Sequence, residues 1–323
     1  MQRVSILIPV RNCEAWVGSA IRSALGQTWP NREVIVADDG SSDESLAVIR
    51  GFGSALRCES GRYGGQNRAR NRLLELARGE WLTFLDADDE LAPDAIEQKM
   101  PLADRADVIY GSMEVAEFSG DKKIGSQFRP AVVPEDLWVS ALKWQLPNTS
   151  ATSFRRDAIK GAGGWPVEVA NCTDYALYFR LLFANARFEA APSARSLYRQ
   201  WSPAQAVHLD PLRMVRTKLD LLWRVGAELQ QRGLMSAARR EAWADEMLQC
   251  IRSLCRLERS AIGPHLERLR SLNPRYLPSG RSFSLPYRVA YRAFGVPVAE
   301  RLSQSTHRWR QRIGLAGRRG LLT

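Results

Sequence analysis

Three continuous apolar runs divide the first hundred residues. They cover residues 4–10, 33–37 and 81–85, and they are typical of strands that are buried on both faces. Segments whose apolar residues recur at helical spacing lie between them. This alternation predicts an α/β fold in which helices flank a mixed, mainly parallel sheet.

The helical segments carry recognisable end signals. Asn12 is the expected N-cap of the first helix, whose apolar residues recur at i, i+4, i+7 and i+8. Ser and Asp residues after the second strand are candidate caps for a helix through residues 45–50. A third helix is expected after Gly65, with Gly79 as its stop.

The pattern changes further along the chain. A strand candidate lies at residues 107–115, a Gly- and Pro-rich segment at 161–166 and a helix candidate at 174–186. From about Pro203 onward, helical patterns rich in Trp and Arg dominate. The α/β part is therefore expected to be followed by a mainly helical C-terminal part.

The composition is that of a soluble globular protein, with 45% hydrophobic and 25% charged residues. A length of 323 residues fits one large domain or two ordinary ones. No apolar stretch reaches the roughly 18 residues of a membrane span, and the N-terminal apolar run is too short for a signal sequence. A cytoplasmic protein is expected.

The five cysteines are widely scattered and show neither CxxC nor zinc-ligand spacing. An odd number of unpatterned cysteines fits free thiols in a reducing compartment. The five are Cys13, Cys58, Cys172, Cys250 and Cys255.

The net charge of +11 is concentrated in the last third of the chain. Residues 201–323 carry 22 Lys and Arg against 9 Asp and Glu. Residues 282–302 and 306–320 also interleave Arg with Tyr, Phe and Trp, which suits a helix lying on an anionic membrane surface. Nucleic acid would need the same charge, but no recognition motif accompanies it. An Arg-rich solvated helical face is the simpler alternative.

Polar clusters follow each of the three apolar runs, at residues 11–12, 38–43 and 86–90. Ligands of open α/β sheets bind outside the carboxyl ends of the strands, so the three clusters are expected to form one site. Asp86 and Asp88 form a D-x-D pair, which an extended chain would place on one side. Such a pair, together with substrate phosphates, is a common way of holding Mg²⁺ or Mn²⁺.

Each acidic cluster also has a purely structural interpretation. A D-x-D pair alone can be an acidic surface turn. Ser41, Ser42 or Asp43 can simply cap the helix that follows.

Two longer blocks carry a resemblance to a known family. "VSILIPVRNCEAWVGSAIRSALGQTWPNREVIVADDGSSDES" and "GGQNRARNRLLELARGEWLTFLDADD" resemble the nucleotide-binding half of family 2 nucleotide-sugar glycosyltransferases, which have the GT-A fold. "NTSATSFRRDAIKGAGGWP" and "TDYALYFRLL" resemble the acceptor half of the same family. The similarity covers about residues 3–202, and the last 120 residues resemble no family that we can place.

The resemblance implies a division of the chain and a set of site residues. The GT-A domain would span residues 1–203, with halves 1–100 and 101–203, followed by the basic helical region 204–323. The implied roles are nucleotide binding by Pro9, Val10, Arg11, Asn12, Asp39 (base), Arg70 and Asp86 (ribose), metal ligation by Asp88, and general-base catalysis by Asp174.

The resemblance further implies an inverting, metal-dependent glycosyltransferase. It would use Mn²⁺ or Mg²⁺ and a nucleoside-diphosphate sugar, with a UDP-sugar as the first expected donor. The acceptor would be a hydroxyl of a glycan or lipid-linked saccharide in cell-surface polysaccharide synthesis, with a peripheral membrane location as one option. The alternative is a weakly active relative that binds nucleotide or glycan, or acts as a scaffold.

The chain departs from the family pattern at a few positions. Arg11 replaces the usual aromatic residue, and Trp201 stands where relatives often carry a His, although His208 follows. Thr173 replaces the Glu that precedes the catalytic Asp. A less acidic neighbour is expected to lower the pKa of Asp174.

Overall fold

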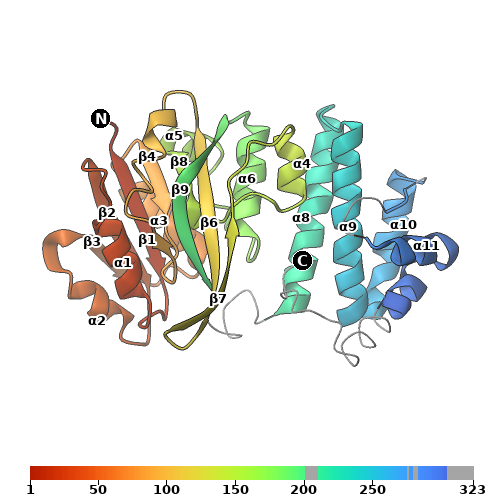
Figure 1. Ribbon diagram of the computed structural model, residues 1–323, viewed down its shortest axis with the longest axis horizontal. Helices are drawn as coiled ribbons and strands as arrows, with labels where there is room; N and C mark the ends of the chain where they lie inside the picture. The colour runs from red at the N-terminus through yellow and green to blue at the C-terminus, as the bar shows by residue number, and fades with distance from the viewer. Residues whose placement is uncertain (201–209, 275, 279–282, 304–323) are drawn as a thin grey trace. The chain divides into compact units, whose positions relative to one another are not determined.

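The structure is a computed structural model that describes residues 1–200, 210–274, 276–278 and 283–303. Contacts divide the chain into two compact units, Met1–Leu209 and Asp210–Thr323. The first unit is an α/β structure built on a nine-stranded sheet, and the second is helical (Figure 1).

The three apolar runs form the parallel half of the sheet. The order is β3-β2-β1-β4, and every neighbouring pair in it is parallel. These strands are β1 (Val4–Val10), β2 (Arg32–Asp39), β3 (Arg57–Gly61) and β4 (Trp81–Phe84). β3 was not predicted, because this edge strand reads "RCESG" and lacks an apolar run.

The remaining strands make the sheet mixed. β8 runs antiparallel to β4 and β6, β9 runs parallel to β6, and the short β5 and the hairpin strand β7 complete the sheet. Their bounds are β5 (Glu90–Leu91), β6 (Val108–Ser119), β7 (Lys122–Arg129), β8 (Thr152–Arg155) and β9 (Phe188–Gln200).

Helices pack on the parallel strands through alternate residues. Ile6 and Ile8 of β1 share an apolar cluster with Val17 and Ile21 of α1, and α3 packs against β1 and β2. The helices of this unit are α1 (Val17–Leu25), α2 (Ser45–Arg50), α3 (Gln66–Leu76), α4 (Leu137–Leu142), α5 (Arg156–Gly161) and α6 (Thr173–Phe183). Short 3₁₀ turns cover Gly53–Ala55, Met100–Leu102 and Thr149–Ala151.

Two predicted helix ends were wrong. α1 begins after Trp16, and Asn12 instead has a left-handed backbone (φ 49°) in the loop before it. α3 ends at Leu76, and Gly79 packs so closely on β1 that an added Cβ would lie 2.6 Å from the amide nitrogen of Ser5. Gly79 therefore serves strand contact rather than helix termination.

The second unit is built around α8 (Pro211–Gln231) and α9 (Ala237–Leu257), which run side by side (Figure 1). Gly226 lets the Trp243 indole lie against the backbone of α8, where its Nε1 donates to the Leu222 carbonyl. A 3₁₀ turn (Arg259–Ala261), α10 (Ile262–Leu272) and α11 (Leu285–Phe294) follow. Within the described residues, every helix is too short or too polar to cross a membrane.

Candidate functional site

The loops after β1 and β2 are joined by hydrogen bonds. Val10 pairs with Asp38 in register, so both strands end at the same edge of the sheet. The Asn12 amide donates to the Ser41 hydroxyl (3.0 Å), and the Asn12 side-chain oxygen accepts from the Ser42 amide (2.8 Å). The first two polar clusters of the sequence therefore lie together.

Asp43 has a structural role, although the N-cap of α2 is Glu44 and makes no side-chain cap hydrogen bond. One of its carboxylate oxygens accepts from the Ser45 amide at the start of α2 (3.0 Å). The other accepts from the Glu14 amide in the neighbouring loop (3.0 Å). Asp43 thus fixes both the helix start and the first loop.

Asp39 is buried at the end of β2 and organises the loop before α3. Its carboxylate accepts from the backbone amides of Tyr63 (2.5 Å), Gly64 (2.9 Å) and Gly65 (2.8 Å). Both glycines have positive φ, 83° and 129°, which lets their amides turn toward one carboxylate. The exposed Arg11 guanidinium lies 4.0 Å from the same carboxylate.

The other residues predicted to line the nucleotide pocket divide into two pairs. Pro9 and Val10 belong to β1 and have buried side chains. Arg11 and Asn12 are exposed in the loop that follows. Of these four, the exposed pair therefore offers side chains to a ligand.

The third polar cluster is a tight turn rather than the extended segment assumed from the sequence. The Asp89 amide donates to the Asp86 carbonyl (3.0 Å). Asp86 and Asp88 remain partly exposed, whereas Ala87 and Asp89 are buried. The two acids of the D-x-D pair therefore both reach the surface, by a turn and not by strand alternation.

Arg70 joins the D-x-D turn to the acceptor half of the domain. Its side chain is 2% exposed, and it donates to the Asp86 carboxylate at 2.6 Å and to the Thr173 hydroxyl at 3.0 Å. The guanidinium stacks over the Trp165 ring, with its carbon 4.3 Å from the ring centroid. A buried charge with a paired carboxylate, a hydroxyl and an aromatic face is held in one geometry.

Trp165 is held in place by the glycine turn before it. Asn71 of α3 accepts from the Trp165 amide (2.8 Å) and donates to its carbonyl (3.0 Å). Gly164 has φ 71°, and an added Cβ would lie 2.8 Å from the Asn71 side-chain oxygen. Glycine is therefore required both by the turn and by the close approach of α3.

Asp89 stabilises the D-x-D turn from inside the protein. Its buried carboxylate accepts from the Ser150 hydroxyl (2.6 Å), the Asn148 amide group (3.2 Å) and the Arg199 backbone amide (3.0 Å). Burial, and then the charges of Asp88 and Asp86, raise its pKa well above the usual range.

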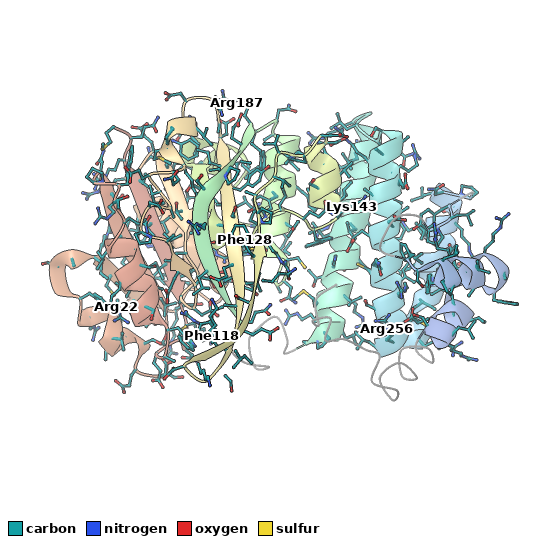
Figure 2. All side chains as sticks on the ribbon, viewed as in Figure 1. Arg22, Phe118, Phe128, Lys143, Arg187 and Arg256 are labelled. Atoms are coloured by element: carbon teal, nitrogen blue, oxygen red, sulfur yellow. The ribbon has the colours of Figure 1, made fainter. Side chains whose placement is uncertain are left out.

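Arg199 of β9 holds the same turn through the backbone carbonyl of Asp88, and no motif in the sequence points to this arginine. Its guanidinium donates to the Asp88 carbonyl (2.6 Å) and pairs with the Glu90 carboxylate (2.6 Å). It stacks over the Trp16 and Phe118 rings at 4.2 and 4.8 Å. Figure 2 shows Phe118 at one end of the sheet and Arg187, just before β9, at the other.

Asp174 lies in the first turn of α6 and keeps part of its surface accessible. Burial raises the pKa of its carboxyl, the Arg70 charge opposes that rise, and the Asp86 charge adds to it. The pKa of Asp174 therefore lies above its ordinary value, and the lowering expected from a Thr rather than a Glu at position 173 stays a prediction. Thr173 instead accepts a hydrogen bond from Arg70, which leaves Asp86 as the carboxylate partner of that guanidinium.

Tyr198 of β9 marks the place where the acids converge. Burial raises the pKa of its phenol, and four carboxylates add to the rise: Asp89, Asp88, Asp86 and Asp174. The D-x-D turn and the start of α6 therefore face one locality. No sequence motif singled out this tyrosine.

The carboxylates of the site fit a divalent ion that takes its remaining ligands from substrate oxygens. Within the described residues no group of three or more His, Cys, Asp or Glu side chains could enclose a metal. Asp86 and Asp88 offer hard carboxylate oxygens at the surface, which matches ions that take one or two carboxylates and complete their shell with phosphate and water. Trp201 and His208 lie outside the described residues.

Comparisons with known proteins identify the N-terminal unit. Residues 5–161 match the model of the family described as glycosyl transferase family 2. An uncharacterised glycosyltransferase of Rickettsia conorii is 36% identical over 124 residues, 36% of this chain and 20% of that protein. A UDP-Glc:α-D-GlcNAc-diphosphoundecaprenol β-1,3-glucosyltransferase of Escherichia coli is 38% identical over 91 residues, 28% of this chain and 36% of that protein.

Solved structures give the same fold over most of the chain. TarS residues 1–349 of S. aureus superpose with a TM-score of 0.60 at 18% identity, covering 95% of this chain and 92% of that one. A mannosyltransferase of Pyrobaculum calidifontis, solved with GDP-Man and Mn²⁺, gives a TM-score of 0.53 at 16% identity, with 95% and 87% coverage.

The sequence matches are confined to one part of the relatives. The first three curated relatives are matched over 20%, 42% and 20% of their own lengths, so the chain spans less than half of each. The match to the family model falls on the unit that carries the site, whereas the similarity to solved structures covers 95% of the chain. The N-terminal unit therefore carries a match to glycosyl transferase family 2 over residues 5–161, and it has the GT-A fold.

Proposed function

We propose that this chain is an inverting glycosyltransferase that moves a sugar from a nucleoside diphosphate to an acceptor hydroxyl. The observation that carries the proposal is the arrangement around Arg70. This guanidinium contacts Asp86 of the D-x-D turn and Thr173 beside Asp174, so it joins the expected donor and acceptor halves.

The nucleotide would bind over the ends of β1 and β2. Arg11 and Asn12 are exposed there, and each carboxylate oxygen of Asp39 has two lone pairs, so Asp39 has acceptor capacity beyond its three backbone bonds. Base recognition by Asp39 and ribose contact by Asp86 are the assignments we propose. Arg70 would act by holding Asp86 rather than by reaching into solvent.

Asp88, with Asp86 beside it, would hold the divalent ion. The ion would neutralise charge on the departing diphosphate. In this chain the Asp88 backbone is held by Arg199, and Asp89 is tied to Ser150. The turn would therefore be formed before the donor arrives, which avoids the cost of ordering it on binding.

Asp174 would be the general base. The acceptor oxygen would bond to the anomeric carbon as the bond to the diphosphate oxygen breaks, and its proton would pass to the Asp174 carboxylate. Burial raises the pKa of this carboxyl, which makes the carboxylate a stronger base than one in water. Family 2 enzymes that invert the anomeric centre need only one base.

Donor and acceptor classes are suggested by the named relatives. The E. coli relative is named for UDP-Glc and a diphosphoundecaprenol-linked GlcNAc, and S. aureus TarS has been solved with UDP-GlcNAc. We propose a UDP-sugar donor, a Mn²⁺ or Mg²⁺ ion and a saccharide acceptor, with a lipid-linked saccharide in polysaccharide synthesis as the first candidate.

A thermal-shift screen tests the donor side. UDP-, GDP- and dTDP-sugars would each be added with Mn²⁺, with Mg²⁺ and with chelator. A ligand at about 100 times its Kd stabilises the folded state by about 2.7 kcal/mol, so a true donor should raise Tm only with metal. Asp157→Asn, at an 85% exposed carboxylate on α5, is the control that should respond like the wild type. If every nucleotide sugar failed with both metals, the proposal would be refuted.

A further inference from the structure

The second unit presents an apolar face to solvent. Three large apolar side chains of α11 are exposed by 61–65% of their surface, and two more are exposed in the helical segment 296–303, which Gly295 separates from α11. We call these residues the C-terminal apolar face: Leu285, Val289, Phe294, Val298 and Leu302. Leu285 and Val289 are four residues apart and share one side of α11, whereas Phe294 lies half a turn away at its end. Monomeric proteins tolerate single exposed apolar residues, but several gathered at one end of a unit call for an occupant.

The opposite side of α11 is well anchored, so this exposure follows from a defined orientation of the helix. Tyr287 and Ala290 are buried, and the Arg252 guanidinium stacks on the Tyr287 ring at 4.1 Å. Arg252 and Arg256 both pair with the buried Glu300 carboxylate (Figure 2 labels Arg256). The side of α11 that carries Leu285 and Val289 therefore faces outward, while the other side and the segment after Gly295 are held by the rest of the unit.

A basic pocket opens beside this face. Its volume is about 470 Å³, and its lining joins the end of α10 to the end of α11. Arg270 reaches across so closely that a Cβ added at Gly295 would lie 3.6 Å from its guanidinium nitrogen. Arg292, Tyr291 and Phe294 line the other side.

The two arginines of the pocket differ from those that anchor the helix. Among the residues that the structure describes, neither Arg270 nor Arg292 has a carboxylate within ion-pair distance, and both are exposed. In the sequence, residues 201–323 carry 22 Lys and Arg against 9 Asp and Glu. The pocket thus offers two uncompensated cations at the edge of an apolar surface.

We propose that this surface binds an anionic lipid bilayer, with the C-terminal apolar face entering the interface and Arg270 and Arg292 binding lipid phosphate. Apolar side chains flanked by arginine are what a helix needs to lie at a charged membrane surface. Each basic residue near such a surface contributes about 1 kcal/mol. Nucleic acid would satisfy the arginines but would leave Leu285 and Val289 in water. This inference goes beyond the proposed transfer reaction and does not depend on it.

Vesicle co-sedimentation tests the inference on the full chain. At low salt, the wild type should pellet with phosphatidylglycerol-containing vesicles and stay in the supernatant with pure phosphatidylcholine. Leu285→Ser/Val289→Ser/Phe294→Ser should lose at least about tenfold in partitioning. Arg270→Gln/Arg292→Gln should lose about 30-fold in partitioning, since two contributions of about 1 kcal/mol add to about 2 kcal/mol.

Matched control variants distinguish binding at this surface from nonspecific attraction by charge or by exposed apolar residues. Arg213→Gln/Arg224→Gln removes the same charge from exposed positions on α8, and Val132→Ser/Val133→Ser removes exposed apolar residues from the first unit. Both control variants should lose less than about threefold in partitioning to the anionic vesicles. Equal losses in test and control variants, or binding to neutral vesicles, would overturn the proposal, as would retention on DNA with none on anionic vesicles. Unchanged Tm and circular dichroism must accompany each variant, and a test variant that remains folded and still binds fully also overturns it.

Discussion

Arg199 donates a 2.6 Å hydrogen bond from its guanidinium to the backbone carbonyl of Asp88. It also contacts the next two carboxylates, Asp89 through its backbone amide and Glu90 through its guanidinium. The last residues of β9 thereby hold the turn that presents the D-x-D pair. A bond that involves a charged donor contributes about 1.5–3 kcal/mol. The geometry of the proposed metal site should therefore depend on a residue that does not itself ligate the metal.

Replacing Arg199 should weaken metal-dependent donor binding more than it weakens the fold. We expect Arg199→Met to raise the apparent Mn²⁺ requirement and the donor KM by about tenfold or more, because the turn must then be ordered on binding. Arg199→Lys should recover only part, since an ammonium cannot reproduce the forked contacts. Metal titrations at fixed donor measure the effect. An unchanged metal requirement in a folded Arg199→Met protein would contradict this role.

Arg70 should set the pH at which Asp174 works. Its positive charge opposes the rise in the Asp174 pKa that burial causes. Arg70→Gln should therefore raise that pKa, keep the base protonated to higher pH and move the acidic limb of the kcat profile upward. Arg78→Gln, at an exposed position just after α3, should leave the limb in place. The pH dependence of turnover decides between these outcomes, and a limb that moved down or stayed put in Arg70→Gln would count against the assignment.

Gly164→Ala should destabilise the first unit by about 1–3 kcal/mol. Its φ of 71° is strained for alanine, and the new Cβ would press on Asn71, which holds Trp165 beneath Arg70. Gly161→Ala is the matched control, because its Cβ would meet no heavy atom within 4 Å at the end of α5. That variant should be as stable as the wild type or up to about 1 kcal/mol more stable. Urea unfolding of the pair measures both, and equal stabilities would show that the turn tolerates a side chain.

Lys99 should make stability depend on pH. Burial lowers the pKa of this lysine to about 7 from 10.5, so between those values the unfolded chain binds more protons than the folded one. Stability should then rise with pH, and the advantage of Lys99→Met over the wild type should be largest near pH 6 and shrink by up to about 1.4 kcal/mol per pH unit toward pH 10. Exposed Lys160→Met should show no such trend. A pH-independent difference between wild type and Lys99→Met would refute this burial cost.

Sequence patterns were sufficient for the α/β class and for the loops that meet at the sheet edge. The runs at β1, β2 and β4 are continuous and apolar because these strands are covered on both faces, and their register brings the following loops together. The pattern could not reveal β3, whose five residues at the sheet edge bury too little apolar surface to leave a periodic signal.

Contacts between distant segments were out of reach of the sequence. Arg199 lies more than a hundred residues from the turn that it holds, and Asp89 has the same residue type as its exposed neighbours although it is fully buried. Asn12 has the composition of a helix cap, but it bonds instead to the loop after β2. In each case a partner brought by the tertiary fold decides the role, and local propensity does not record that partner.

The most direct test of the account measures donor binding and sugar transfer in the same two variants, Asp88→Asn and Asp174→Asn. With the donor and metal found by the screen, Asp174→Asn should bind the donor with wild-type metal dependence and lose transfer by a factor of about 100 or more. Asp88→Asn should lose metal-dependent donor binding itself. Full transfer by Asp174→Asn, or unchanged metal-dependent binding by Asp88→Asn, would contradict the central claim that these two carboxylates serve as base and metal ligand.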